Sequence, residues 1–172
     1  KKIYKLKKRP RINPLIIHYY DLRLLKKDAF ISQKFLKLYK KFSPGPLTYI
    51  LKKRKNSKIS SLANANLKTI AVRFPKNTIT RKLLGSLKFP LAIPSANLSS
   101  AVSPVCSSDV LDEFGEKLSF ILDGGKCKIG LESTVINLNK KIQILRPGAI
   151  SSKEISEILK QKVFFSNKSN KV

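Results

Sequence analysis

The stretch Pro90-Leu91-Ala92-Ile93-Pro94-Ser95-Ala96-Asn97-Leu98-Ser99-Ser100 changes character halfway along its length. Its first half is an apolar run of strand length, and its second half consists mostly of small polar side chains. Pro94 has no backbone N–H, so we expect the strand to leave its sheet at this residue. Because alternate residues of an extended chain point the same way, Ser95 and Asn97 can face one ligand together. Their hydroxyl and amide suit phosphate, hydroxyl or base-edge groups, and a plain Ser/Asn turn is the alternative interpretation.

The composition predicts one globular domain, because 172 residues with 42% hydrophobic content can form a core. No apolar run is long enough to span a bilayer and no signal-peptide pattern opens the chain, so we expect a cytoplasmic protein without a membrane partner. Two cysteines, Cys106 and Cys127, are too few for a disulfide framework and are expected to be buried thiols in a reducing compartment. With a single histidine and no zinc-type spacing, no protein-bound metal is predicted.

The formal net charge of +26 has two interpretations, and both remain open. A basic surface attracts phosphates, whether those of ATP or those of RNA. The lysines are also spread along the whole chain, which is typical of a compositional bias rather than of one binding face. Particular positions therefore carry more information than the total charge.

Hydrophobic periodicity and turn signals predict strands and helices that alternate along the chain. Strands are expected at 15–19, 47–51, 69–74, 90–94, 119–122, 132–138 and 142–145, the last two forming a hairpin around Asn139-Lys140-Lys141. Helices are expected from Ile3 to just before Pro10, at 32–42, and from a cap at Thr78 or Thr80 to about Leu87. A further helix is expected at 110–114, with a cap at Ser107, Ser108 or Asp109. The last one begins at the capping box of Ser151 and Glu154 and runs to about Lys162. This order indicates an α/β domain at 1–162 with a mixed sheet, followed by a loose tail at 163–172.

Isolated polar residues in apolar surroundings are the candidate functional groups. Arg73 is the only charge in the strand at 69–74, and a charge in such a place normally has a partner or a ligand. His18 follows an apolar run, where a core or edge histidine is the more common interpretation. Lys7 and Arg9 end the first helix, where cations also interact favourably with the helix dipole. Neither Gly-x-Gly-x-x-Gly nor Gly-x-x-x-x-Gly-Lys occurs, so a nucleotide would bind by neither standard loop.

Five segments, taken in order, resemble the YrdC family, the L-threonylcarbamoyladenylate synthases. They are Lys7-Lys8-Arg9-Pro10 through Asn13-Pro14-Leu15-Ile16-Ile17-His18; Pro44-Gly45-Pro46-Leu47-Thr48; Val72-Arg73-Phe74-Pro75; Ser95-Ala96-Asn97 with Ser103-Pro104; and Asp123-Gly124-Gly125 through Gly130-Leu131-Glu132-Ser133-Thr134-Val135 to Arg146-Pro147-Gly148. The resemblance implies a twisted, open α/β sheet with a basic concave ligand cleft. It also implies synthesis of threonylcarbamoyl-AMP from L-threonine, bicarbonate and ATP, with release of pyrophosphate, for modification of adenosine in tRNA.

The resemblance assigns roles to individual residues. Lys7 and Arg9 would neutralise the leaving pyrophosphate, helped by Mg²⁺ that accompanies ATP. ATP would be bound by Arg9, Asn13, Ser95, Asn97, Ser103 and Arg146, with Thr69 as a weaker candidate, and L-threonine by His18, Arg73 and Ser133. Cys127 would be structural. The implied partners are tRNA or double-stranded RNA and the downstream proteins that transfer the threonylcarbamoyl group.

The chain also departs from the family pattern. Family members begin with a strand and a Pro-Thr-Glu-Thr-x-Tyr-Gly-Leu loop that nothing here matches, so we expect the first strand and loop to be missing. Asn77 stands where the family often has histidine, and Ser100 where it often has glycine. The alternatives are an RNA-binding module, a domain related to the hydrogenase-maturation carbamoyltransferases, and an inactive fragment of a synthase.

Overall fold

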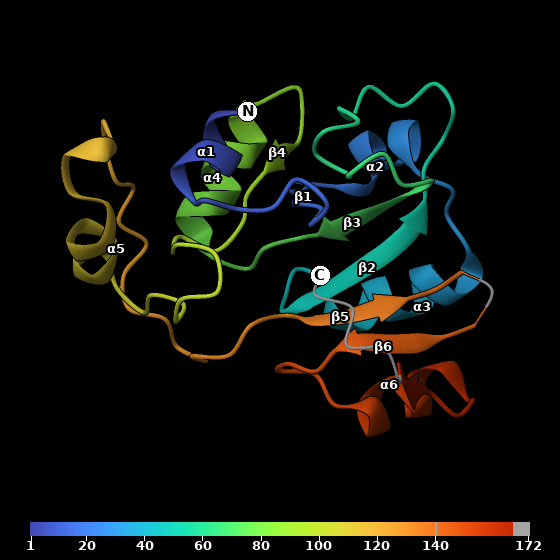
Figure 1. The fold of residues 1–172 in the computed structure, drawn as a ribbon. Helices are drawn as coiled ribbons and strands as arrows, with labels where there is room; N and C mark the ends of the chain where they lie inside the picture. Colours follow the sequence, from blue (N-terminus) through green and yellow to red (C-terminus); the bar gives the residue numbers. More distant parts are fainter. Residues whose placement is uncertain (140, 167–172) are drawn as a thin grey trace.

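A mixed sheet forms the centre of the computed structural model, which describes residues 1–139 and 141–166 (Figure 1). In this described part the sheet has seven strands in the order β4-β1-β3-β2-β5-β6-β7. The strands are β1 (Ile16–His18), β2 (Leu47–Lys52), β3 (Thr69–Arg73), β4 (Leu91–Ala92), β5 (Thr134–Asn137), β6 (Gln143–Arg146) and β7 (Phe164–Phe165). The pairs β1–β3, β2–β5 and β6–β7 are parallel, and the other neighbours are antiparallel. The predicted α/β class with a mixed sheet is therefore confirmed.

Six α-helices and one 3-10 helix join or flank the strands in the described part of the chain. They are α1 (Lys2–Leu6), α2 (Leu22–Asp28), α3 (Gln33–Phe42), α4 (Thr78–Ser86), α5 (Ser107–Phe114), the 3-10 helix η1 (Gly115–Lys117) and α6 (Ser152–Leu159). In α3, Phe35 and Leu38 are fully buried, and the Ser32 hydroxyl accepts from the Phe35 amide to start the helix. Helix α6 begins at the predicted capping box of Ser151 and Glu154. Side chains from α2, α3 and α6 join the strands in one core.

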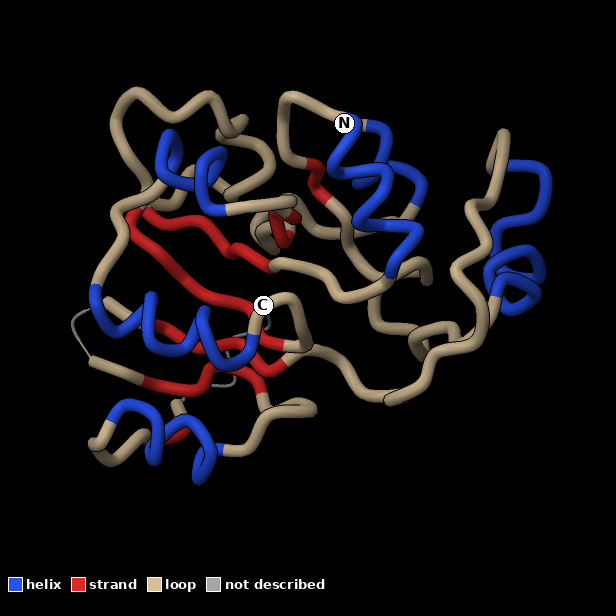
Figure 2. Tube along the Cα trace, turned by 180° about the vertical axis from the view of Figure 1, so that it is seen from behind, coloured by secondary structure: helices blue, strands red, loops and turns tan. Residues whose placement is uncertain are grey.

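The predicted strand at 119–122 is wrong, because these residues have no strand partner in the structure. They follow α5 as irregular chain, and the Phe120 side chain is 82% exposed. Both views place α5 and its neighbouring loops at one end of the molecule, away from the sheet (Figures 1 and 2). An apolar run becomes a strand only where a sheet edge accepts its backbone hydrogen bonds, and here no edge does so.

Other boundaries also differ from the prediction for local reasons. The Asn77 side chain, rather than Thr78 or Thr80, caps α4 by accepting from the Thr80 amide at 3.0 Å. Helix α2 was not predicted, although the Asp21 carboxylate caps it by accepting from two backbone amides. Helix α5 starts earlier than expected, directly after Cys106.

The last described residues belong to the folded domain, and neither cysteine is fully buried. Within the predicted loose tail at 163–172, Val163 is buried in the core and residues 164–165 form β7 beside β6. Residues 167–172 of that tail and Lys140 of the predicted hairpin lie outside the described residues. The prediction of buried thiols is wrong for Cys127, which is exposed on a loop, and Cys106 is partly exposed. Among the helices that the structure describes, none combines the length and the apolar character needed to cross a membrane.

Candidate functional site

A row of polar residues crosses the sheet from β1 to β2. His18 pairs with Arg73 in the parallel β1–β3 ladder, and Arg73 pairs with Thr48 in the antiparallel β2–β3 ladder. Residues that lie opposite one another in a ladder point to the same face of the sheet. His18 and Arg73 therefore face one side together, and both line a cavity of about 250 Å³. Its remaining lining residues are Gly45, Pro46, Pro75, Lys76, Asn77, Thr80 and Ile93.

His18 is neutral in this cavity at ordinary pH. Burial lowers the pKa of His18 to about 4, and the nearby Arg73 guanidinium acts in the same direction. Its Nδ1 lies 3.3 Å from the carbonyl oxygen of Ile16. Because a carbonyl only accepts hydrogen bonds, this contact assigns the imidazole proton to Nδ1 and leaves Nε2 as an acceptor.

Arg73 brings a positive charge into the cavity without a carboxylate partner. Its Nε donates to the carbonyl of Gly45 at 3.2 Å. Neither of the two ion pairs in the described part of the chain involves Arg73. Burial lowers the pKa of Arg73 from its usual value, with the Arg146 charge as a second cause. Arg73 is partly buried, and a guanidinium in such a place without a counter-charge can bind an anion; a carboxylate matches its two parallel donors.

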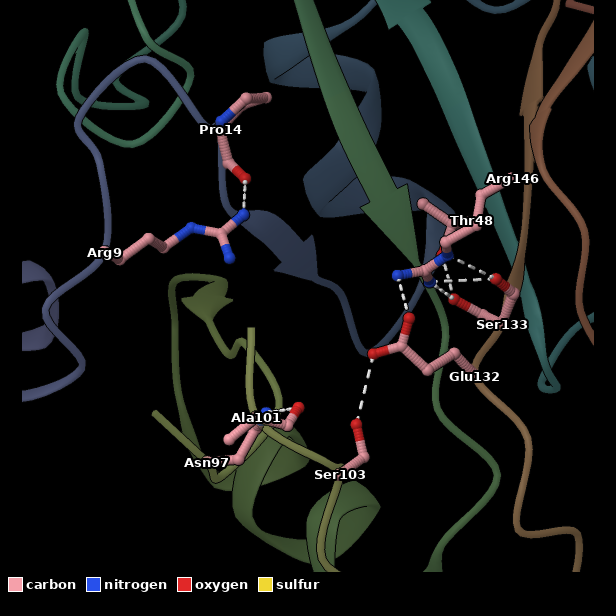
Figure 3. A network of polar contacts seen from close by, with 9 residues as sticks. All are labelled: Arg9, Pro14, Thr48, Asn97, Ala101, Ser103, Glu132, Ser133 and Arg146. Atoms are coloured by element: carbon pink, nitrogen blue, oxygen red, sulfur yellow. Dashed lines mark hydrogen bonds and ion pairs between the residues drawn. The ribbon is translucent and has the colours of Figure 1, made fainter. Parts of the chain in front are cut away.

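Ser133 and Arg146 form a second polar group beside this row (Figure 3). Nη2 of Arg146 donates to the Ser133 hydroxyl at 3.0 Å, and both Nε and Nη2 also donate to the Ser133 carbonyl. Nη1 of Arg146 forms an ion pair with Glu132, whose other oxygen accepts from Ser103 at 3.3 Å. The Ser133 hydroxyl is also 2.8 Å from the hydroxyl of Thr48. Arg146 is thus fixed in place by Glu132 and Ser133.

The loop that follows β4 is held by Lys7. The Lys7 amine donates to the carbonyl of Ser95 at 2.7 Å and to the carbonyl of Asn97, and this lysine is only 4% exposed. Burial lowers the pKa of Lys7, and the adjacent Arg9 contributes as a second cause. The Asn97 amide donates to the carbonyl of Ala101 at 2.7 Å, while its Oδ1 is buried without a partner among the described residues. Lys7 therefore shapes the Ser95–Asn97 loop, and its direct role in catalysis stays a prediction.

Arg9 lies between the first helix and β1. Its Nε donates to the carbonyl of Asn13 at 3.2 Å. Its Nη2 donates to the carbonyl of Pro14 at 2.9 Å (Figure 3). Arg9 also lines a second cavity, of about 410 Å³, together with Lys1, Lys2, Tyr4, Lys5 and Arg11. Burial lowers the pKa of Arg9. Asn13 contributes only its backbone carbonyl to these contacts.

The structure links the predicted site residues in separate groups: His18 with Arg73, Lys7 with the Ser95–Asn97 loop, and Ser103 with Ser133 and Arg146 through Glu132. Thr69 joins none of these groups. Thr69 begins β3, whereas Arg73 ends it, so these two residues lie at opposite ends of the same strand. At a rise of about 3.3 Å per residue, Thr69 is roughly 13 Å along the strand from the cavity residues. Its carbonyl accepts from Asn64, away from the Ser95–Asn97 loop. The structure therefore gives no support to Thr69 as a residue of the nucleotide side.

Three contributors were not predicted as site residues from the sequence. Thr48 contacts Ser133, and the only available signal was its place in the Pro44–Thr48 segment. Glu132 pairs with Arg146, and the available signal was that acidic residues are few in this strongly basic chain. Asn77 donates to the carbonyl of Gly124 at 3.1 Å and so connects the cavity wall to the glycine turn. In the described part of the chain, no group of three or more His, Cys, Asp or Glu residues could hold a metal ion.

Comparisons with known proteins agree with the fold of the chain. The family model for Sua5, YciO and YrdC proteins, described as "Telomere recombination", matches residues 1–148. A threonylcarbamoyl-AMP synthase of Schizosaccharomyces pombe is 37% identical, with 98% of this chain and 48% of the relative covered. One of Pyrococcus abyssi is 39% identical, with 92% and 47% covered. A crystal structure of P. abyssi Sua5 in complex with L-threonine superposes with a TM-score of 0.89 at 38% identity, covering 95% of this chain and 48% of that one. The chain thus spans about half the length of these relatives.

Proposed function

The chain belongs to the family of Sua5, YciO and YrdC proteins, and on this premise we propose that it forms threonylcarbamoyl-AMP. The substrates are L-threonine, bicarbonate and ATP, and pyrophosphate is released. The observation that carries the proposal is the cavity in which the unpaired Arg73 guanidinium lies beside neutral His18. The product would serve modification of adenosine in tRNA through downstream transfer proteins.

The cavity suits an amino acid better than a nucleotide. Its volume of about 250 Å³ is below the range typical of drug-sized ligands, which starts at roughly 300 Å³. Arg73 would bind the carboxylate of threonine with two parallel hydrogen bonds. Nε2 of His18 would accept a hydrogen bond from the amine or the hydroxyl of threonine. The L-threonine bound to P. abyssi Sua5 supports this choice of ligand.

The nucleotide would bind outside the cavity of His18 and Arg73, where the Ser95–Asn97 loop, Arg9 and Arg146 lie. Bicarbonate gives carbon dioxide, to which the amine of threonine adds to form a carbamate; the hydroxide lost by bicarbonate and the proton lost by the amine leave as water. A carbamate oxygen then attacks the α-phosphorus of ATP while the bond to pyrophosphate breaks. Such a transfer depends mainly on holding the two reactants in line and on stabilising the leaving group. Fixed guanidinium groups contribute charge without reorganisation. Mg²⁺ enters this scheme as part of the substrate, bound to the phosphates of ATP.

The test compares Arg73→Ala with Arg23→Ala, a change at an exposed arginine outside the cavity whose side chain is 89% accessible. Losing a charge-assisted hydrogen bond costs about 1.5–3 kcal/mol, so Arg73→Ala should weaken threonine binding by about ten- to a hundredfold. Calorimetric titrations with L-threonine and with ATP measure the two affinities, and a pyrophosphate-release assay measures turnover. Equal losses for both ligands, or a wild-type chain that binds no threonine, would contradict the proposal.

A further inference from the structure

Thr48 is a buried hydroxyl at the centre of the sheet without an assigned role. It lies on β2 between Arg73 of β3 and Val135 of β5, and none of its surface is exposed. Its hydroxyl oxygen is 2.8 Å from the Ser133 hydroxyl, which is the one side-chain partner of Thr48 in the described part of the chain. If Thr48 faced only apolar side chains, valine would fill the same space without burying a hydroxyl group. The contact between the two buried hydroxyl groups therefore indicates a role for Thr48.

The direction of this hydrogen bond follows from counting donors and acceptors. The Ser133 oxygen already accepts from Nη2 of Arg146, because a guanidinium can only donate. If Ser133 donated to Thr48, the Thr48 proton would be left in a fully buried position without an acceptor. An unsatisfied buried donor is costly, and Thr48 is 0% exposed whereas Ser133 is 2% exposed and adjoins the polar side chains of Arg146 and Glu132, so the free proton is better placed on Ser133. The favourable arrangement is therefore the one in which Thr48 donates to Ser133.

This arrangement fixes the character of Ser133. Its oxygen has two lone pairs, and the donors from Arg146 and Thr48 occupy both of them. The proton of Ser133 then points along the remaining tetrahedral direction and can only be donated. Accepting from a charged donor also polarises the hydroxyl and strengthens it as a donor.

We propose that Thr48 is a positioning residue that makes the Ser133 hydroxyl an obligate hydrogen-bond donor to the carboxylate of the amino acid substrate. The proposal rests on the proposed function for its ligand, but the direction of the Thr48–Ser133 bond does not. Arg73 pairs with Thr48 across β2 and β3, so the guanidinium and the Ser133 hydroxyl belong to one part of the sheet. A hydroxyl that can only donate a hydrogen bond binds a carboxylate, which accepts, better than a ligand group that can itself only donate.

The direction of the bond is measured first, by NMR of hydroxyl protons in the whole chain. We expect a slowly exchanging hydroxyl proton that couples to the Hβ of Thr48 and disappears in Thr48→Val. The Ser133 proton should exchange rapidly with water when no ligand is bound. A missing protected proton on Thr48, whether or not Ser133 carries one, overturns the proposal independently of any ligand.

The consequence is measured by titration with L-threonine and with L-threoninol, which has the carboxylate replaced by an alcohol. Thr48→Val should weaken L-threonine binding by roughly three- to tenfold, the range expected for one oriented hydrogen bond. Binding of L-threoninol should change less than twofold, and Thr48→Ser, which keeps the hydroxyl, should bind both ligands as the wild type does. Equal weakening for both ligands, or a Thr48→Ser variant as weak as Thr48→Val, overturns the proposal. A wild-type chain that does not bind L-threonine refutes the proposed function, and the NMR result then decides the role of Thr48 alone.

Discussion

His18 offers a quantitative test, because it is the only histidine in the chain and its imidazole signal is therefore unambiguous. Burial and the nearby Arg73 lower its pKa to about 4 in the folded protein, from an ordinary value of 6.5. Between these two values the unfolded chain binds a proton that the folded chain does not bind. Stability should therefore fall as the pH drops from about 6.5 to about 4, and below that range His18 contributes no further loss.

The size of this loss follows from the difference between the two pKa values. One pKa unit corresponds to about 1.36 kcal/mol, so a difference of about 2.5 units gives about 3 kcal/mol. A loss of that size is a large part of the stability of a typical domain, which is about 5–15 kcal/mol. Carboxylates whose pKa is lowered in the folded state, such as Asp21, also lose their contribution in acid. A variant without the imidazole is needed to separate these effects.

The assay combines an NMR titration with urea unfolding of the wild type and of His18→Gln. We expect an imidazole midpoint near pH 4. The free energy of unfolding of the wild type, relative to His18→Gln, should decrease by about 3 kcal/mol between pH 7.5 and pH 4. A midpoint at pH 6 or above, or a difference between the two proteins that does not change with pH, would refute the reasoning.

Two further substitutions test the support of the site. Lys7→Met removes the amine that holds the carbonyls of the loop at 95–97, so ATP binding should weaken tenfold or more while L-threonine binding is retained. The exposed Lys8→Met is its control, and equal calorimetric effects of the two changes would contradict the assignment. Gly148→Ala would place a Cβ 2.5 Å from a backbone nitrogen of β5, so we expect the free energy of unfolding to fall by about 1–3 kcal/mol. Gly85→Ala, whose Cβ meets only a tyrosine side chain at 3.1 Å, should unfold like the wild type, and similar urea midpoints for both variants would exclude a close-packing role for Gly148.

The parts of the fold that could be predicted from the sequence are those whose signals are local. Helix α3 carries its cap and its buried face within eleven residues, and α6 carries a complete capping box. The segment at 119–122 has the same apolar character as a strand but no partner in the sheet, and a partner is not a local property. The cap of α4 was misassigned because threonine and asparagine are both good caps, and only the backbone angles select Asn77.

The residues of the candidate site also differ in how far they could be predicted from the sequence. His18, Arg73 and Ser133 were predicted as site residues because they lie in segments that resemble the family, and this assignment stays a prediction. Thr69 has a similar appearance in sequence, yet it lies at the far end of β3 from Arg73. Thr48 could not be identified, because its role depends on a contact with a residue 85 positions away in the chain. Strand register decides such contacts, and register is set by the whole sheet.

The distribution of acidic residues says more about the site than the total charge of +26. Two arginines of the described part have ion-pair partners, Arg146 with Glu132 and Arg23 with Asp21. Glu132 pairs with Arg146 and holds it in position beside Ser133, so the charge of this guanidinium is partly compensated. Arg73 is a partly buried cation of the cavity and has no ion-pair partner in the described part of the chain. An anion bound there replaces a missing counter-charge beside a partly desolvated guanidinium, which the fully solvated lysines of the surface do not offer.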